Sequence, residues 1–377
     1  MTEATVQPLS GLWKPTHLKA LYYGPNSVAK YLRSCLPSET SKALIITGSS
    51  LASKTSLISD VEKLLGDHHA ATFSRIGQHA PVADLDQAAD LAQNDGSIDT
   101  IISIGGGSPI DSAKVISYRN KEKGRKPFYH ITIPTTLSAA ECTSFGGYTN
   151  EKGVKTGVGD PELAPHVIIY DATFALKTPP YLWLSTGMRA MDHAVESMYH
   201  PTATELSHMM NLQAVSNLFV YMPRYKKDPT DLNVITNLQL AAFASLGFLG
   251  LNLKGGLGLS HTLGYALGSP YQIPHGVTSC LTLGHVVKLK AEDPASAAAI
   301  SRIVPFIGGS RTGNDRLDAE MVGNMILKLV HDLGLKTTLT EKGVGRDQVS
   351  IIVERATGGQ TSGILYDKVK ALVEGLY

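Results

Sequence analysis

Cysteine is scarce in this sequence, and neither sign of charge is in excess. Only Cys35, Cys142 and Cys280 occur among 377 residues. They are too few and too scattered for a disulfide framework or a thiolate zinc site, which indicates a reducing, cytoplasmic compartment. Lys and Arg number 34 against 33 Asp and Glu, a formal net charge of +1. This balance excludes the broad electrostatic attraction on which nucleic-acid binders and polybasic membrane proteins depend. We therefore expect a small-molecule ligand, with no nucleic-acid or membrane partner.

Long apolar runs are missing as well. The N-terminal residues MTEATVQPLSGLWKP contain no apolar core segment, so they do not resemble a secretory signal. The stretch Leu232–Leu253 carries no charged residue, but it contains amide side chains that lipid would penalise, namely Asn233, Asn237, Gln239 and Asn252. We therefore predict a buried helix there and no membrane span.

The length and the periodicity predict two domains. The 377 residues exceed the roughly 250–300 at which one hydrophobic core stops growing. In the first half, apolar β-branched runs alternate with helical periodicity, and strands are expected at 43–47, 71–74, 100–104, 130–134 and 167–170. This alternation predicts a mostly parallel sheet covered on both faces, which binds ligands beyond the carboxyl ends of its strands.

After Thr178-Pro179-Pro180 the pattern becomes helical, without a convincing strand. Helices are expected over 183–199, 211–221, 234–251, 291–306, 321–333 and 348–357. The Pro-Pro pair is the expected boundary, because it cannot continue a helix and stiffens the crossing chain. We predict an α/β domain over residues 1–178 and an all-helical domain over residues 179–377.

The strongest local signal is a glycine-rich turn between a strand and a helix. The strand 101–104 runs into Gly105-Gly106-Gly107, and the next helix opens with Ser108 and Asp111. Glycines let a backbone turn tightly and approach a ligand, and a helix N-terminus offers free N–H groups to phosphate. An alternative is that Ser108 and Asp111, at capping-box spacing, only cap the helix.

A second polar segment, PTTLSAAECTS at 134–144, is dense in hydroxyl groups. By itself it could be an ordinary solvated loop. However, GGGSPID, IPTTLSAAE and GVKTGVGDPELAPHVIIYD together resemble, in content, order and spacing, the iron-containing alcohol dehydrogenase family. The LSAAE variant is similar to the maleylacetate-reductase branch of that family.

The resemblance implies a Rossmann-like N-terminal dinucleotide-binding domain, a C-terminal helical domain, a nicotinamide cofactor in the cleft between them, and a homodimer. Gly106, Gly107 and Ser108 would bind the pyrophosphate, with Asp111 nearby. Lys155 would reach the nicotinamide ribose, and His79 would approach the cofactor. The adenosine and ribose side would be lined by Thr135, Thr136, Ser138 and Ser144. Without the resemblance, Lys155 could be an ordinary surface lysine.

Metal-binding members of the family hold a divalent ion with one aspartate and three histidines. In this sequence His193, His261 and His275 fall on the histidine positions, but Arg189 occupies the aspartate position. Asp192 is next to His193, and one residue along a helix turns about 100°, so we expect it to point off the ligand face. A cation about 4 Å from another costs several kcal/mol even at an effective dielectric of about 20. We therefore expect little tightly bound iron or zinc, although imidazoles do favour such metals.

Arg189 and three imidazoles would instead suit a substrate carboxylate or carbonyl oxygen. Alternatively, Arg189 pairs with Asp192 or Glu196 on its own helix and is structural. Tyr265 lies four residues after His261, where its phenol could donate a proton to a nascent alkoxide, or simply pack.

The turn after the strand 43–47 bears on the choice of cofactor. A carboxylate at such a position accepts hydrogen bonds from the ribose of NAD and repels a 2′-phosphate. Here the turn reads Gly48-Ser49-Ser50, and the first acid beyond it is Asp60. We expect tolerance of NADPH beside NADH.

The leading hypothesis is an NAD(P)-dependent oxidoreductase that moves hydride between the cofactor and a carbonyl or alcohol. A dehydroquinate-synthase-like cyclase is a second hypothesis, but it would need more phosphate-binding cations in the helical domain. A cofactor-binding protein that has lost its chemistry is the third.

Overall fold

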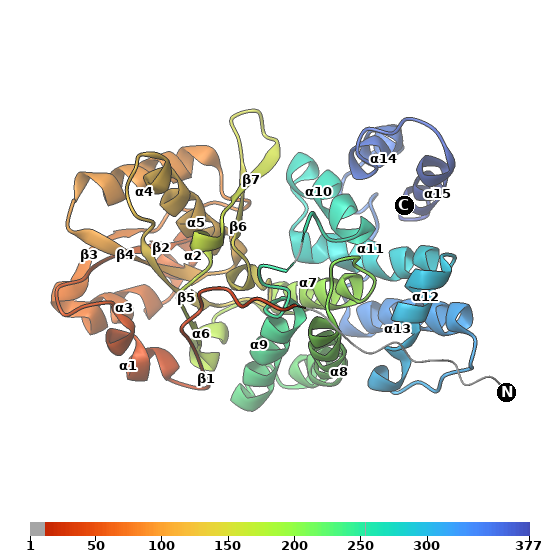
Figure 1. Ribbon diagram of the computed structural model, residues 1–377, viewed down its shortest axis with the longest axis horizontal. Coiled ribbons are helices and arrows are strands. Elements are labelled where there is room, and N and C mark those ends of the chain that lie inside the picture. Colours follow the sequence, from red (N-terminus) through yellow and green to blue (C-terminus); the bar gives the residue numbers. More distant parts are fainter. Residues whose placement is uncertain (1–11, 253) are drawn as a thin grey trace.

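The computed structural model describes residues 12–252 and 254–377 and divides into a sheet-containing part and a helical part (Figure 1). Residues 1–11, which include most of the N-terminal segment considered above, lie outside this description, as does Leu253. Among the described residues, no helix combines the length and the apolar character needed to cross a membrane.

A six-stranded, entirely parallel sheet forms the first part, in the order β1-β8-β5-β4-β2-β3. Its strands are β1 (Ala20–Tyr23), β2 (Lys42–Thr47), β3 (His69–Phe73), β4 (Ile98–Gly105), β5 (Tyr129–Pro134) and β8 (Val167–Tyr170). The register pairs Thr47 with Ile104, and Gly105 with Pro134. The turns after β2, β4 and β5 therefore meet at one edge of the sheet.

Alternate residues of each central strand enter different cores, because successive side chains point to opposite faces. On β2, Leu44 and Ile46 pack with Ile101 of β4 under α4 and α5, whereas Ile45 packs with Ile102 under α1 and α3. The covering helices are α1 (Ser27–Tyr31), α2 (Ser49–Lys54), α3 (Leu57–Leu65), α4 (Val82–Asn94), α5 (Gly107–Glu122) and α6 (Ala172–Ala175). The expected parallel sheet with helices on both faces is confirmed.

A separate antiparallel hairpin projects between the two parts of the molecule (Figure 1). It consists of β6 (Phe145–Thr149) and β7 (Lys155–Gly159). Gly147 lies opposite Gly157, and the ring of Phe145 covers the space that a Cβ on Gly157 would need. The sequence analysis predicted neither this hairpin nor the edge strand β1.

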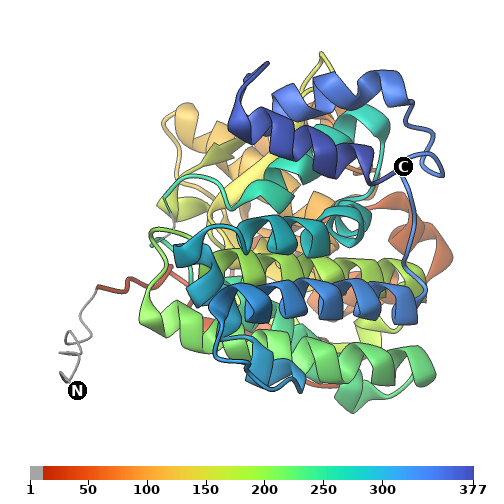
Figure 2. The same ribbon diagram turned by 90° about the vertical axis from the view of Figure 1, so that its right-hand side faces the viewer.

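The second part is helical and is built around α7 (Pro180–Met198), whose residues from Trp183 to Met198 are all buried. Figure 2 shows it lying among the other long helices. The other α-helices of this part, long and short, are α8 (Glu205–Lys227), α9 (Leu232–Leu246), α10 (Leu259–Tyr271), α11 (His275–Lys290), α12 (Pro294–Ser301), α13 (Asp315–Leu333), α14 (Val349–Ala356) and α15 (Ile364–Glu374).

The helical half fits the prediction, but several boundaries differ. α9 ends at Leu246, before the predicted end at 251, and the predicted helix 291–306 is divided into α12 and a short 3₁₀ turn at Val304–Ile307. Pro179 directly precedes α7 and Pro180 is its first residue, a position that proline tolerates. The exact domain boundary at residue 178 stays a prediction.

Candidate active site

The glycine turn lies at the carboxyl end of β4. Gly105 has φ +142°, a backbone conformation that other residues rarely adopt, and Gly106 is the N-cap of α5. A Cβ on Gly106 would lie 3.1 Å from Thr136 Cγ2. Ser108 is inside the helix, and its hydroxyl accepts a hydrogen bond from the backbone N–H of His79 at 3.1 Å. Ser108 therefore does not act as the N-cap, and the simple capping interpretation is wrong for this residue.

The hydroxyl-rich segment after β5 lies against the glycine turn. The hydroxyl of Thr136 donates to Ser138 Oγ at 3.1 Å, and Ser138 Oγ would be 3.4 Å from a Cβ on Gly107. Thr135 is buried, and its carbonyl accepts a hydrogen bond from Thr178. Ser144 is half-buried immediately before β6. Thr136 and Ser138 thus line the glycine turn, and the backbone N–H of Thr135 donates to the carbonyl of Gly105 at 2.8 Å.

Lys155 and Asp111 share the space above Gly147 of the hairpin. A Cβ there would lie 3.1 Å from Lys155 Nζ and 3.6 Å from Asp111 Oδ2. Burial lowers the pKa of Lys155, and Arg189 adds to this effect, while Asp111 opposes it. Lys155 is therefore a half-buried amine beside Asp111, close enough to Arg189 for its charge to be felt.

A second lysine at this site, Lys114 of α5, is fully buried. Its ammonium donates to the carbonyls of Ala140 and Phe145 at 2.6 and 2.8 Å and to Thr143 Oγ1 at 3.1 Å. It therefore fastens α5 to the segment that leads into the hairpin. The sequence analysis missed Lys114, and only its place one helical turn after Asp111 could have drawn attention to it.

The turn after β2 reaches the same edge of the sheet. Gly48 is the N-cap of α2, and a Cβ there would lie 3.3 Å from the carbonyl oxygen of Ile76. Ser49 and Ser50 are exposed. Their hydroxyls are thus open to solvent beside the glycine turn.

Three helices bring the predicted catalytic residues together. Arg189 and His193 come from α7, His261 and Tyr265 from α10, and His275 begins α11. Ring centroids of His193 and His261 are 4.9 Å apart. Gly264 and Gly268 of α10 make room for this cluster, since Cβ atoms there would lie 3.3 Å from Arg189 Nη1 and 3.1 Å from His275 Cε1.

His79 joins the cluster from the sheet-containing part. It has φ 64°, and its ring meets the ring of His275 edge-on at a centroid distance of 4.9 Å. Burial, together with Lys155, lowers the pKa of His79 to about 4. A neutral imidazole therefore lies directly where the two parts of the molecule meet, between the glycine turn and the histidine cluster.

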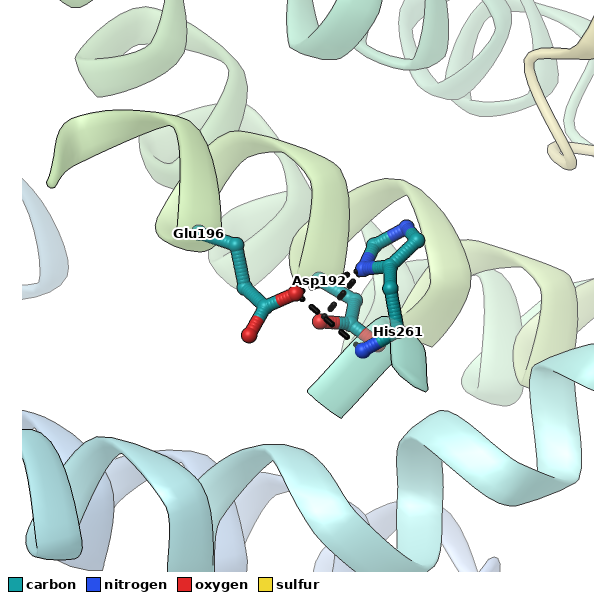
Figure 3. Close-up of side chains that lie close together, drawn as sticks. All are labelled: Asp192, Glu196 and His261. Atoms are coloured by element: carbon teal, nitrogen blue, oxygen red, sulfur yellow. Dashed lines mark hydrogen bonds and ion pairs between the residues drawn. The ribbon is translucent and has the colours of Figure 1, made fainter. Parts of the chain in front are cut away.

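His261 is held by carboxylates (Figure 3). Its Nδ1 is 2.7 Å from Glu196 Oε2 and 3.4 Å from Asp192 Oδ1. Glu196 also accepts the backbone N–H groups of Ser260 and His261 at the start of α10. Because a carboxylate only accepts, Nδ1 carries the proton that goes to Glu196, and Nε2 is left free toward the site.

The three imidazoles differ in charge. Burial and neighbouring cations hold the pKa values of His193 and His275 well below the usual 6.5. Burial and Arg189 also disfavour a charged His261, but Asp192 and Glu196 outweigh them and raise its pKa above 6.5. The site thus combines two neutral imidazoles with one that favours its protonated form.

Asp192 was expected to point off the ligand face, because one residue along a helix turns about 100°. Its Oδ2 lies 3.6 Å from Arg189 Nη1 and accepts hydrogen bonds from Ser260 and Ser279 at 2.9 and 2.6 Å. The helices α10 and α11, which pack beside α7, bring these partners to Asp192, and its carboxylate lies on the Nδ1 side of His261. The expectation about the ligand face stays a prediction.

Two sets of atoms could act as metal ligands. Within the described residues, buried His193 Nδ1, His261 Nε2 and His275 Nδ1 have no hydrogen-bond partner. The side chains of Asp192, Glu196 and His261 also bring ligand atoms within 4.8 Å of one another. The charge of Arg189 disfavours a metal ion at either set of atoms. This residue is only 6% exposed, and its guanidinium lies beside Asp192. The imidazole and carboxylate donors suit iron or zinc, but the nearby guanidinium of Arg189 would repel either ion.

Tyr265 is 42% exposed, and its ring lies 5.9 Å from the Arg189 guanidinium and 6.1 Å from the ring of His275. It is therefore at the rim of the cluster, and it is not a core tyrosine.

Comparisons with known proteins agree with this arrangement. Residues 19–172 match the family described as iron-containing alcohol dehydrogenase, and residues 183–371 match the C-terminal part of the Fe-containing alcohol dehydrogenase family. A maleylacetate reductase of a Rhizobium species is 30% identical over 296 residues, 78% of this chain and 77% of the relative. Alcohol dehydrogenase 4 of Schizosaccharomyces pombe is 26% identical over 98% of this chain and 90% of its own.

The fold has close counterparts among solved structures. The crystal structure of maleylacetate reductase from Agrobacterium tumefaciens superposes with a TM-score of 0.81 at 25% identity, covering 99% of both chains. These matches favour oxidoreduction over the cyclase and over a non-catalytic binding protein. The chain therefore belongs to the iron-containing alcohol dehydrogenase family, and it is an NAD(P)-dependent oxidoreductase that acts on CH–OH and carbonyl groups, similar to the maleylacetate reductases.

Proposed function

We propose that this enzyme reduces the carbonyl group of an oxo acid with NADPH or NADH, and that it does so without a tightly bound metal. The observation that carries the proposal is the buried guanidinium of Arg189 among His193, His261 and His275. A planar guanidinium suits a carboxylate or a developing oxyanion, because it offers paired N–H donors and a permanent charge.

The proposed cofactor site follows the edge of the sheet. Gly106, Gly107 and Ser108 at the start of α5 would hold the pyrophosphate, where backbone N–H groups and the helix dipole favour an anion. When bound, the nicotinamide supplies a hydride to the substrate carbon. Around the adenosine and the two riboses, the proposed contacts are Gly48, Ser49, Ser50, His79, Asp111, Thr135, Thr136, Ser138, Ser144 and Lys155.

The helical part would hold the substrate. Arg189 and the buried imidazoles donate to the carbonyl or carboxylate oxygens, and the proton that completes the alcohol comes from the half-exposed Tyr265 hydroxyl. His79, held neutral by its burial, closes the space between His275 and the cofactor side.

Members of this family usually use iron, but the charge at this site disfavours a metal ion. Any divalent cation among His193, His261 and His275 would be repelled by the Arg189 guanidinium, which occupies the position that the resemblance assigns to an aspartate in the metal-binding members of the family. We propose at most substoichiometric iron or zinc. If a metal does bind, those three histidines are the proposed ligands.

We also propose a cytoplasmic homodimer. The three cysteines are free and buried, which supports a reducing compartment. The dimer rests on the family resemblance alone.

The test measures NADPH and NADH oxidation with a panel of oxo mono- and dicarboxylates and their methyl esters. The protein is first treated with a chelator, and its metal content is measured by mass spectrometry. We expect chelation to leave activity unchanged. We also expect the free acids to exceed their esters in kcat/KM by roughly 10- to 100-fold, because a hydrogen bond to a charged group contributes about 1.5–3 kcal/mol. Equal rates on acid and ester would contradict the role of Arg189. Full metal occupancy, with activity lost on chelation and restored by the metal, would contradict metal independence.

A further inference from the structure

Asp192 is fully buried and forms ion pairs with both Arg189 and His261. Its carboxylate links three helices, because Ser260 of α10 and Ser279 of α11 both donate to it from outside α7. Figure 3 shows the carboxylate beside the pair formed by Glu196 and the ring of His261. No part of it faces solvent, so it cannot itself meet a substrate.

The guanidinium of Arg189 is held from one side only. It has five N–H donors. In the described part of the chain, its polar contacts are a 3.4 Å hydrogen bond to Ser279 Oγ and the 3.6 Å ion pair with Asp192. Ser279 in turn donates to Asp192, so the carboxylate governs both contacts. The remaining donors are free for an anionic ligand.

An isolated buried cation is costly, and its side chain would turn toward any water it could reach. Asp192 supplies the counter-charge at the base of the site. Glu196 cannot replace it, because both of its oxygens already accept hydrogen bonds. Oε1 accepts from the Tyr199 hydroxyl and the backbone N–H of Ser260, and Oε2 accepts from the backbone N–H and the ring of His261.

We propose that Asp192 is a positioning residue that acts through Arg189: it fixes the guanidinium against the base of the site and directs the free N–H donors toward the substrate. The ion pair Arg189–Asp192 is therefore neither purely structural nor a remnant of a lost metal site. This proposal rests on the proposed substrate-binding role of Arg189.

A double-mutant cycle tests it with wild type, R189M, D192N and the double variant. All four are assayed on whichever carbonyl compound the wild type reduces best. In the wild-type background, D192N is expected to lower kcat/KM by about 30-fold with an unchanged dissociation constant for NADPH. In the R189M background it is expected to have no further effect, because residues that act as a unit are not additive.

A matched control separates positioning from stability. Asp318 is also fully buried and pairs with Arg311 at 3.2 Å, far from the site in sequence on α13. D318N is expected to lower the free energy of unfolding while leaving kcat/KM unchanged. If D192N does not fold, S279A takes its place in the cycle, because Ser279 lies between the two charged groups.

Equal effects of D192N in both backgrounds would overturn the proposal, since the carboxylate would then act independently of Arg189. A loss of NADPH affinity as large as the loss of kcat/KM would also overturn it. The double-mutant cycle and the substrate panel can fail separately. An enzyme that reduces only neutral carbonyls would refute the oxo-acid proposal, but the coupling between Arg189 and Asp192 could still be measured with such a substrate.

Discussion

At the scale of single residues, the choice between the two nicotinamide cofactors depends on Gly48. Gly48 directly follows β2, and β2 pairs with β4. An acidic residue at position 48 would therefore lie next to the glycine turn that follows β4. No carboxylate occurs in Gly48-Ser49-Ser50, and the serines are exposed. The neutral turn therefore neither attracts the ribose hydroxyls of NADH through charge nor repels a 2′-phosphate.

We predict that wild type uses both cofactors and that G48D shifts the preference toward NADH. The wild-type ratio of kcat/KM values for NADH and NADPH should stay below about 100-fold, or about 2.7 kcal/mol. G48N is the matched control, because it adds the same shape without the charge against the Ile76 carbonyl. A wild-type preference for NADH above that ratio, or an equal shift in G48N, would contradict the charge argument.

The residues of the histidine cluster show what the sequence could and could not reveal. The three histidines and Arg189 were predicted from family spacing, and the structure places them in one cluster. The contacts of Asp192 were not predictable from one helix alone, because its partners Ser260 and Ser279 belong to helices remote in sequence. The roles assigned to all of these residues stay predictions until variants are measured.

At the scale of elements, Lys114 joins α5 to the segment before the hairpin. We predict that K114M lowers the free energy of unfolding by about 3 kcal/mol, because the carbonyls of Ala140 and Phe145 and the hydroxyl of Thr143 all lose the charged donor that Lys114 supplies from its fully buried position. It should also weaken dinucleotide binding by about tenfold, since the start of α5 and the hydroxyl-rich segment would no longer be held together.

Urea unfolding and calorimetric titration with NADPH measure these two effects. The exposed Lys126 supplies the control variant K126M, which makes the same change of side chain without a buried partner. Unchanged stability and affinity in K114M would mean that the segment 140–145 is held by other contacts.

The elements that sequence periodicity missed share one property: their pairing depends on tertiary contacts. The strands β6 and β7 contain two glycines each, which have little intrinsic preference for strands. They pair because Phe145 packs on Gly157 and because Lys114 anchors the chain at Phe145. The central strands β2, β4 and β5 were predictable, because continuous β-branched runs are typical of strands buried on both faces.

At the scale of the whole molecule, six histidines are buried or half-buried in their neutral form. Burial is the first cause in each case, and it lowers the pKa values of His79 and His166 to about 4. The same cause lowers the pKa values of further histidines, namely His130, His193, His275 and His285. His261 has the opposite shift, because Asp192 and Glu196 favour its charged form.

The direction of the resulting pH dependence follows from proton binding. As the pH falls from 6.5 toward 4, the unfolded chain binds protons on these histidines while the folded chain does not, so the folded state loses stability. His261 contributes the reverse effect, which is present below 6.5 and lost as the pH rises through its raised folded-state pKa. Six depressed groups against one raised group make acid destabilising overall.

We predict that the free energy of unfolding, measured by urea titration between about pH 7.5 and about pH 5, decreases with acid at a slope of about 1.4 kcal/mol per pH unit for each proton taken up on unfolding. H130Q should reduce this slope, because it removes a fully buried imidazole while keeping a donor for Ser103. The control H331Q changes an exposed histidine at the end of α13 and should leave the slope unchanged. A flat profile between pH values of about 6.5 and 5 would show that the buried imidazoles already bind protons in the folded state. In that case the site would be more positive than described, and its attraction for an anionic substrate stronger.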